Sequence, residues 1–396
     1  MNNSLPTARN ISELPNIYCY GCGVCVNVCP TKCIKMVDDH EGFPYPQVDE
    51  AHCISCKKCV LDCPGFNEYK NKRQLSDPLF FGGYVQDDRV RFTSSSGGFF
   101  TPIAEKIIAA GGVVYGAIYD FDQMTVKHSR AETEIELAPM RKSKYVQSQT
   151  ADILHQVRKD LLANIPVLFT GTPCQVEGLY LFLERDYPNL LTCDIICHGV
   201  PSPGLFQRHF RYLEQKHQSK INKIDFRTKE KGWGGPQNLF LDLGFDASKK
   251  LTHSLFDPYY ALFLANLSLR PCCFHCKYAS TNRRSDITLG DFWGVSKKHP
   301  ELFDHKGTSL VLINTKKGME VLESISPSVE IAPIQDVDPF PPNLAKPSHR
   351  PGYRDRFFNK ISLKDWKKHR LKAHLIAVFS IVKYKVSGLI KNLQKN

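Results

Sequence analysis

Cysteines carry the most specific chemistry in this 396-residue chain, and they are grouped rather than scattered. Of the fifteen, nine lie between residues 19 and 63, three between 174 and 197, and three between 272 and 276. In the first group, four cysteines and a following proline recur 34 positions later: Cys19, Cys22, Cys25, Cys29 and Pro30 return as Cys53, Cys56, Cys59, Cys63 and Pro64. Two copies at a fixed spacing indicate a duplicated supersecondary unit, and thiolates this close together indicate metal ligands.

Each copy reads C-x2-C-x2-C-x3-C-P, which is similar to the bacterial two-cluster ferredoxins, where the fourth cysteine of each run binds the other cluster. The sequence therefore predicts two [4Fe-4S] clusters. Their ligands would be Cys19, Cys22, Cys25 and Cys63 for one cluster, and Cys53, Cys56, Cys59 and Cys29 for the other. A pair of zinc sites is the alternative, but a four-thiolate zinc site needs no third cysteine in the loop. We expect Gly21 and Gly23 to let backbone N–H groups approach the sulfurs, and Cys33, which has no counterpart in the repeat, to be a small buried residue.

Four later cysteines are expected to form a third site. Cys174 follows a predicted strand in GTPCQVEG, and Cys197 ends the next one in DIICHGVPSPGLF. Cys273 and Cys276 form a C-x2-C in RPCCFHCKYA, where Cys272 could substitute for Cys273. Because α/β folds bind ligands at the carboxyl edge of the sheet, these four thiolates could hold a third cluster there. Buried cysteines plus a small zinc loop are the alternative.

The segment Ser94–Phe100, SSSGGFF, is a glycine-containing turn before an amphipathic stretch. Free N–H groups at a helix start bind anions, so this turn is a candidate phosphate cradle. N-capping by Ser95 or Ser96 explains the same residues equally well. Neither G-x-G-x-x-G nor G-x-x-x-x-G-K-[ST] occurs, so a Rossmann dinucleotide site or a P-loop has no support.

The elements that must position these residues alternate between strand and helix patterns. Buried strands are predicted at Val113–Tyr119, Val167–Thr170 and Leu191–Cys197, the last with Cys193 in the core, and helices at Phe99–Ala110, Ala151–Ala163, Gln175–Glu184 and Leu205–Gln218. This alternation predicts an α/β domain with a mixed, largely parallel sheet. The further expectations are a strand-rich stretch at Ile221–Leu243, a strand at Ser309–Asn314, a helix from near Lys317, an irregular segment at Pro333–Pro351 and a final long basic helix.

Composition narrows the class of protein. Hydrophobic residues make up 42% and charged residues 23%, which excludes a wholly disordered or fibrous chain. No apolar run approaches the ~20 residues of a membrane-spanning helix. The opening stretch has neither a basic start nor an apolar segment, unlike a secretory signal. A cytoplasmic location with reduced thiols is therefore expected.

The net charge of +12 is concentrated at one end, because the residues from Lys367 onward contain eight Lys or Arg and no acid. The remaining +4 is spread over the body without a basic stripe, so no nucleic-acid partner is predicted. Spacings of three and four place the apolar residues of the tail on one helical face: Leu371, Leu375, Val378, Phe379, Val382, Val386 and Leu389. Such a helix can lie on an anionic membrane surface; docking on the protein's own body or on a partner is the alternative.

Taken together, GTPCQ, CHGVPSP, SSSGGF and the C-x2-C followed by SDITLGDFWG resemble the beta-subunit family of coenzyme F-420 hydrogenase and dehydrogenase, over residues 80–350. The resemblance implies an FAD and one adjacent [4Fe-4S] cluster, whose ligands would be the same Cys174, Cys197, Cys273 and Cys276. It also implies that the flavin site is lined by Ser95, Ser96, Gly97, Gly98, Lys144 and Tyr145. Asp286, Asp291 and Trp293 lie in SDITLGDFWG and would either adjoin the flavin or form a strand and a tight turn.

Four segments follow from these observations: a dicluster ferredoxin-type α+β domain at 1–66, a linker at 67–80, a flavin and [4Fe-4S] domain at 81–350, and a basic amphipathic tail at 351–396. The expected function is that of an iron–sulfur flavoprotein oxidoreductase. It would move electrons between a ferredoxin or another redox partner protein and a small-molecule two-electron substrate, such as a reduced deazaflavin. The alternatives are a ferredoxin-driven reductase of an unsaturated or hydroxylated substrate, and a non-catalytic electron-transfer subunit. The expected location is cytoplasmic, with the tail at the inner face of the membrane.

Overall fold

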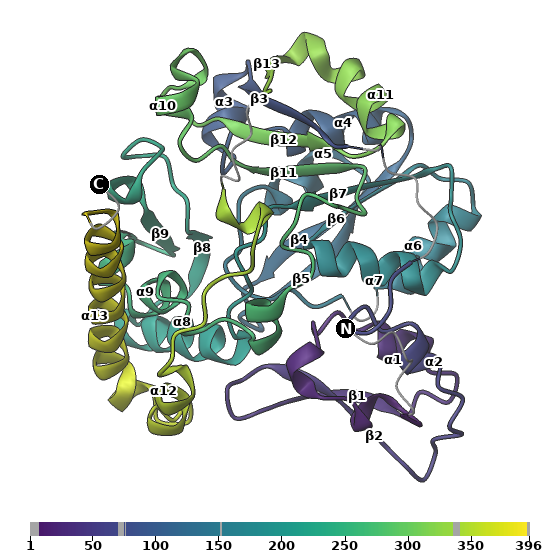
Figure 1. Cartoon of the computed structure of the whole chain (residues 1–396), viewed down its shortest axis with the longest axis horizontal. Coiled ribbons are helices and arrows are strands. Elements are labelled where there is room, and N and C mark those ends of the chain that lie inside the picture. Colours follow the sequence, from purple (N-terminus) through teal and green to yellow (C-terminus); the bar gives the residue numbers. More distant parts are fainter. Residues whose placement is uncertain (1–7, 70–74, 76, 151–152, 336–340, 394–396) are drawn as a thin grey trace.

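A computed structural model describes residues 8–69, 75, 77–150, 153–335 and 341–393 (Figure 1). Residues 8–69, here called the N-terminal unit, contain two short helices and a two-stranded antiparallel sheet. These elements are α1 (Val24–Val28), β1 (Ile34–Asp38), β2 (Pro44–Val48) and α2 (Lys58–Leu61). The unit packs below the main body in the view of Figure 1.

The main body is built on an eight-stranded sheet with the order β13-β3-β12-β11-β7-β6-β4-β5. Its strands are β3 (Leu79–Val85), β4 (Val113–Asp120), β5 (Thr125–Ala131), β6 (Val167–Gly171), β7 (Leu190–Ile195), β11 (Ile287–Asp291), β12 (Ser309–Ile313) and β13 (Val329–Pro333). The four strands β11, β7, β6 and β4 are mutually parallel, and β3 runs in the same direction, whereas β12, β13 and β5 run antiparallel to them. The predicted mixed α/β architecture is therefore confirmed, with antiparallel strands toward both edges. Cys193 is buried within β7, as expected.

Helices cover both faces of this sheet. One face is covered by α4 (Phe100–Ala109) and α11 (Lys316–Ile325), and the other by α6 (Ile153–Leu162) and α7 (Pro173–Leu183). All four match predicted helices; Ala151, the predicted first residue of the helix that corresponds to α6, lies outside the described residues. Shorter helices complete this part: α3 (Asp88–Phe92), α5 (Glu134–Leu137) and α10 (Val295–Lys298).

Helix α7 is buried on nearly every side, because the sheet lies on one side and the N-terminal unit on the other. Gly178 permits this arrangement: a Cβ there would lie 2.9 Å from a Val24 methyl and 3.6 Å from the Cys22 sulfur. The core of the N-terminal unit is thus continuous with that of the main body, with Val24 and Ile34 in the same apolar cluster as Leu179.

A second, smaller antiparallel sheet consists of β8 (Ile221–Asp225), β9 (Phe240–Phe245) and β10 (Lys249–His253). It packs with α8 (Pro203–His217), α9 (Pro258–Leu264) and the last helix, α13 (Trp366–Leu393), while α12 (Arg354–Lys360) precedes that helix. The predicted long basic helix is present, and it docks on the protein's own body through Ala373 and Ala377 (Figure 1). No helix within the described ranges is both long and apolar enough to cross a bilayer.

Candidate metal centres

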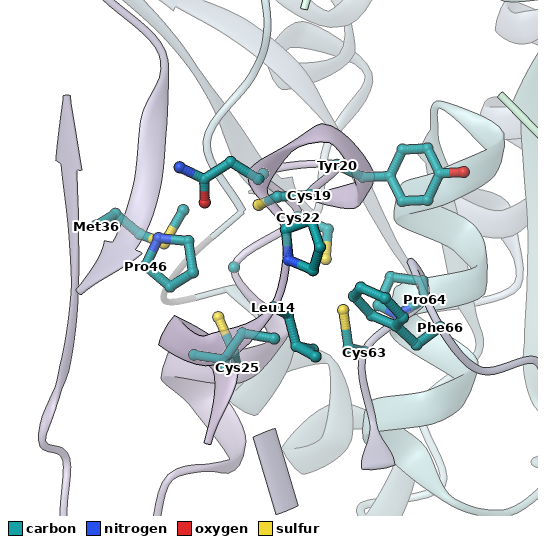
Figure 2. Close-up of a pocket in the computed structure, with 15 residues that line it drawn as sticks. Leu14, Cys19, Tyr20, Cys22, Cys25, Met36, Pro46, Cys63, Pro64 and Phe66 are labelled. Atoms are coloured by element: carbon teal, nitrogen blue, oxygen red, sulfur yellow. The ribbon is translucent and has the colours of Figure 1, made fainter. Parts of the chain in front are cut away.

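Four cysteines from both copies of the repeat surround one pocket of the N-terminal unit, here called the first pocket. They are Cys19, Cys22, Cys25 and Cys63. Figure 2 shows their sulfur atoms facing a shared space. Cys63 belongs to the second copy, so the structure brings together the crossed set that the spacing predicts.

The other crossed set lines a second pocket, formed by Cys29, Cys53, Cys56 and Cys59. Cys56 is exposed, so this pocket lies nearer to solvent than the first. Cys33 is buried as expected, but it also lines this pocket, with its sulfur 3.5 Å from that of Cys29. The spacing of the repeat does not reveal this contact, because Cys33 has no partner position in the second copy.

The loops before α1 and α2 repeat one backbone shape. Gly21 and Gly23 have φ of 64° and 72°, and the residues 34 positions later, Ser55 and Lys57, have φ of 51° and 62°. Left-handed residues at these points turn backbone N–H groups toward one concavity, which suits an anionic group. In the first loop the Val24 N–H bonds to the Cys22 sulfur, while burial raises the pKa of that thiol to about 12.

The donor chemistry of these two pockets fits iron–sulfur clusters, because each presents a crossed set of four thiols, with Cys33 as a fifth in the second pocket, and a concave backbone loop. Among the residues with described positions, no three His, Cys, Asp or Glu side chains are placed to hold a single metal ion. A cluster is held by thiolates spread around its corners rather than converging on one ion.

The third cysteine set comprises Cys174, Cys197, Cys273 and Cys276, and the structure brings these four together as well. Cys174 lies in the first turn of α7, directly after β6, and Cys197 follows β7. The 3-10 turn Pro271–His275 carries Cys273. Burial and the neighbouring Cys273 thiol raise the pKa of Cys276 to about 11, and burial with Cys273 and Cys276 raises the pKa of Cys197.

Cys272 and Cys273 have different surroundings. The Cys273 sulfur accepts a hydrogen bond from the Val200 N–H at 3.5 Å and adjoins Cys197. Cys272 is buried against Tyr20 and Tyr278. Tyr20 directly follows Cys19, so the third cysteine set and the first pocket lie back to back. This placement favours Cys273 as the ligand, which stays a prediction.

Two loops expected at the flavin site are joined in the structure. The Ser95 hydroxyl accepts a hydrogen bond from the Ser143 N–H at 2.7 Å. Lys144 donates to the Arg141 carbonyl at 2.6 Å, and burial lowers the pKa of Lys144 to about 7. The Tyr145 ring stacks on Phe263, with centroids 4.4 Å apart.

Other residues of SSSGGF hold the loop in place. The Ser96 hydroxyl donates to the Thr308 carbonyl at 2.7 Å, and the Gly97 N–H donates to the Ser309 hydroxyl at 2.9 Å. A Cβ at Gly97 would overlap the carbonyl of the adjacent strand β3. Gly98 has φ of 94°. N-capping of α4 by Ser95 or Ser96 is wrong, because Phe99 occupies the N-cap position without a side-chain bond.

Asp286 and Asp291 lie at opposite ends of β11. Asp286 accepts hydrogen bonds from the Thr192 N–H at 2.8 Å and from the Thr315 hydroxyl at 2.8 Å, so it ties strands together. Asp291 instead contacts Arg227 Nη1 at 2.5 Å.

Arg227 and Lys229 were not anticipated from the sequence, and both adjoin the predicted flavin loops. Arg227 donates to the Tyr145 hydroxyl at 3.2 Å and lies over the Trp293 ring, 5.0 Å from its centroid. Lys229 donates to the Ser96 carbonyl at 2.5 Å, and burial together with Arg91 lowers the pKa of Lys229 to about 7. The sequence offered only a weak indication, DFRTKEKGWGG, a run of cations inside the stretch Ile221–Leu243 that was predicted to be rich in strands.

Comparison with known proteins finds matches to two family models, each over part of the chain. Residues 166–337 match the family model for the C terminus of the coenzyme F420 hydrogenase/dehydrogenase beta subunit, and residues 18–66 match the model "4Fe-4S dicluster domain". An uncharacterized polyferredoxin-like protein of Methanocaldococcus jannaschii is 34% identical over 59 residues, which are 13% of this chain and 35% of that protein. The chain therefore spans about a third of the length of this curated relative. A solved chain of the F420-reducing [NiFe] hydrogenase complex from Methanosarcina barkeri aligns with a TM-score of 0.46 at 20% identity, covering 67% of this chain and 84% of that one.

Proposed function

We propose that this chain is an iron–sulfur flavoprotein that exchanges electrons between a one-electron carrier protein and a two-electron organic substrate. Its sequence matches the models of a 4Fe-4S dicluster domain and of the C-terminal domain of the coenzyme F420 hydrogenase and dehydrogenase beta-subunit family. Iron–sulfur electron transfer of the oxidoreductase type follows from the two domains. The observation that carries the finer proposal is the line of three cysteine sets, in which the first pocket lies between the second pocket and the third cysteine set.

This arrangement gives the electron path an outer and an inner end. The second pocket is the outer end, because Cys56 is exposed and Ile54 beside it is largely exposed as well. A ferredoxin or similar carrier would approach there. Electrons would pass between the second and first pockets within the N-terminal unit, and then through the contact of Tyr20 with Cys272 to the third cysteine set.

The residues around Ser95 and Ser143 fit the phosphates of FAD, because three basic side chains, Lys144, Arg227 and Lys229, lie beside these loops. A bound anion there would stabilise their protonated forms. A bound flavin would accept electrons in pairs and release them singly, which connects a two-electron substrate to one-electron clusters. Within the protein, Ser96 and Gly97 keep the loop against β12, and Arg227 orients the Tyr145 hydroxyl.

The substrate belongs to the same proposal. We favour a small two-electron substrate such as a reduced deazaflavin; a ferredoxin-driven reductase of an unsaturated or hydroxylated compound and a non-catalytic subunit of a larger complex remain the competing functions. The location we propose is cytoplasmic, with α13 at an anionic membrane surface. The exposed apolar residues of α13 support the proposed contact with the membrane surface.

The test is anaerobic purification with iron, sulfide and flavin quantified per chain. Three four-iron clusters predict about twelve irons, with one FAD. Cys174→Ser should lower iron by about four atoms, whereas Cys193→Ala, which changes a buried cysteine of the sheet core, should leave it unchanged. About eight irons in the wild type, or equal iron in both variants, would contradict the third cluster.

Turnover separates the competing functions. The fully loaded protein should oxidise a reduced deazaflavin with a ferredoxin as acceptor. Activity only with reduced ferredoxin and an unsaturated or hydroxylated acceptor would favour the reductase. Failure with every donor in a fully loaded sample would favour the non-catalytic role.

A further inference from the structure

Arg270 lies completely buried between the first pocket and the third cysteine set. Its guanidinium donates to the Cys19 carbonyl at 2.6 Å, to the Pro44 carbonyl at 2.8 Å and to Gln147 Oε1 at 2.9 Å. It also lies 3.4 Å from the Cys19 sulfur and over the Tyr45 ring, 4.3 Å from its centroid. The side chain thus reaches from the loop that carries Cys273 to a cysteine 251 residues earlier.

The partners of Arg270 are unusual for a buried arginine. Arg354 pairs with Glu41, and Arg283 with Asp194, so each of these buried cations has a carboxylate beside it. Within the described part of the chain, Arg270 forms no such ion pair, and the Cys19 sulfur is its one hydrogen-bond partner that can carry negative charge. A buried cation without a counter-charge is strongly unfavourable. A thiolate-bound cluster in the first pocket would supply that charge.

The corresponding cysteine of the second copy has a different neighbour. Cys53 is approached by the Asn10 amide at 3.8 Å, and the same amide donates to the Glu50 carboxylate at 3.0 Å. The first pocket therefore has a buried cation at its first cysteine. The first cysteine of the second pocket instead has a neutral amide, a nearby carboxylate and Arg9, an exposed cation that is already paired with Glu13.

We propose that Arg270 is a positioning residue that sets the reduction potential of the cluster in the first pocket and makes it easier to reduce than the cluster in the second pocket. Reduction transfers one electron from the external reductant to the cluster and adds one negative charge there. A buried guanidinium at a ligand sulfur stabilises that added charge, because attraction is strong where water is excluded. Hydrogen bonds to the sulfurs and burial are general determinants of cluster potentials.

The same contact gives the electron path a direction of easier transfer. Electrons entering at the exposed second pocket would move to the more readily reduced cluster of the first pocket, next to the third cysteine set. The inference rests on the proposed function in one respect: the first pocket must hold a cluster.

The experiment is a reductive titration of the anaerobic holoprotein, followed by electron paramagnetic resonance. Arg270→Gln should shift one cluster toward its oxidised form at least about tenfold at a fixed potential, which is about 59 mV for one electron. Arg270→Lys should shift it less, because lysine keeps the charge without the planar fork. Lys35→Gln removes an exposed cation of β1 that lines neither pocket, and it should shift nothing, because water screens that charge.

A variant that keeps Arg270 makes the inference testable if both Arg270 variants lose iron. Cys56→Ser removes a ligand of the second pocket and should abolish the lower-potential signal of the dicluster pair. Loss of the higher-potential signal instead, or unchanged potentials in iron-replete Arg270 variants, would overturn the role of Arg270. Absence of any iron–sulfur signal in the wild type would refute the proposed function itself, which is a distinct result.

Discussion

His128 shows how burial fixes a protonation state at the scale of one residue. It lies on β5 with only 6% of its surface exposed, and its ring stacks on Phe169 with centroids 5.4 Å apart. Its Nε2 lies 2.8 Å from the Thr170 carbonyl, to which it donates in the neutral form. Burial lowers the pKa of His128 from 6.5 to about 4. The folded protein therefore holds a neutral imidazole where the unfolded chain would already be protonated.

This difference predicts a specific loss of stability in mild acid. The contribution of neutral His128 is fully present above pH 6.5 and is lost as the pH falls toward 4, because the unfolded state binds the proton first. Between pH 7 and pH 5 the loss is about 2 kcal/mol. His128→Gln keeps an N–H donor and has no titration, so its free energy of unfolding should fall less over that interval. Anaerobic urea denaturation of both proteins measures this, and parallel losses would contradict it.

The sequence predicts site residues that lie close together along the chain better than residues that packing brings together from distant segments. The crossed cysteine sets follow from spacing because three ligands of each set lie within one short loop. Arg227 and Lys229 were missed because they come from beyond β8 in the smaller sheet. Only the packing of the two sheets brings Lys229 to Ser96 and Arg227 to Tyr145. The glycines of SSSGGF were expected at a ligand, whereas Gly97 is required by close contact with β3.

At the scale of elements, the duplicated loops share one backbone but not one environment. A Cβ at Gly21 would overlap the Gln147 amide and lie 2.7 Å from Arg270 Nη1. Ser55 occupies the corresponding position with φ of 51° and is exposed. The first loop packs against the main body, and the second faces solvent. Glycine is therefore required in only one copy, although both copies need a left-handed residue.

A matched pair of variants tests this difference. Gly21→Ala should destabilise the protein by about 2 kcal/mol, because a left-handed alanine costs roughly 1–2 kcal/mol and the added methyl displaces Gln147. Ser55→Gly should stabilise it by up to about 1 kcal/mol, since it relieves the same backbone cost in the open loop. Denaturation midpoints and iron content per chain measure both effects. Equal tolerance of the two changes would show that the first loop is not confined by the main body.

Strong periodicity explains which elements could be predicted. Helices α4, α6, α7 and α8 and strands β4, β6 and β7 have long apolar faces or buried runs, and they lie within a few residues of their expected bounds. The antiparallel edge strand β5 was missed, because its sequence, TVKHSRA, is polar and only half-buried. Its partner β4 supplies the hydrogen bonds that its own sequence does not indicate.

At the scale of the whole molecule, α13 has two apolar faces. The face toward α9 is formed by small residues, Ala373 and Ala377, both fully buried. Most of the predicted apolar face points outward instead, although Val378 packs against the body. The outward residues form an exposed stripe: Leu371 is 60% exposed, Leu375 72%, Phe379 70% and Val382 53%. The helix α13 can therefore dock on the body and also present an amphipathic surface outward, because different residues form the two faces.

The exposed stripe predicts binding to an anionic bilayer. Lys367, Lys368 and Lys372 are exposed near it, and no acid occurs from Lys367 onward, so the charge complements anionic headgroups while the stripe enters the acyl boundary. The double variant Leu375→Ser and Phe379→Ser should weaken binding to phosphatidylserine vesicles at least tenfold, because two large apolar side chains no longer leave water. Truncation after Asp365 is a poorer test, since it would uncover the core that Ala373 and Ala377 close.

Vesicle flotation at low and high salt distinguishes this surface from nonspecific adhesion. Ile135 on α5 is 87% exposed, so Ile135→Ser is the matched control and should bind as the wild type does. Binding should fall as salt rises, because the lysines contribute through screened attraction, and it should be weak on zwitterionic vesicles. Equal binding by the double variant and the wild type would refute a membrane role for the stripe. If the wild type instead forms a complex with a carrier protein and the double variant does not, the stripe is the binding surface for that partner.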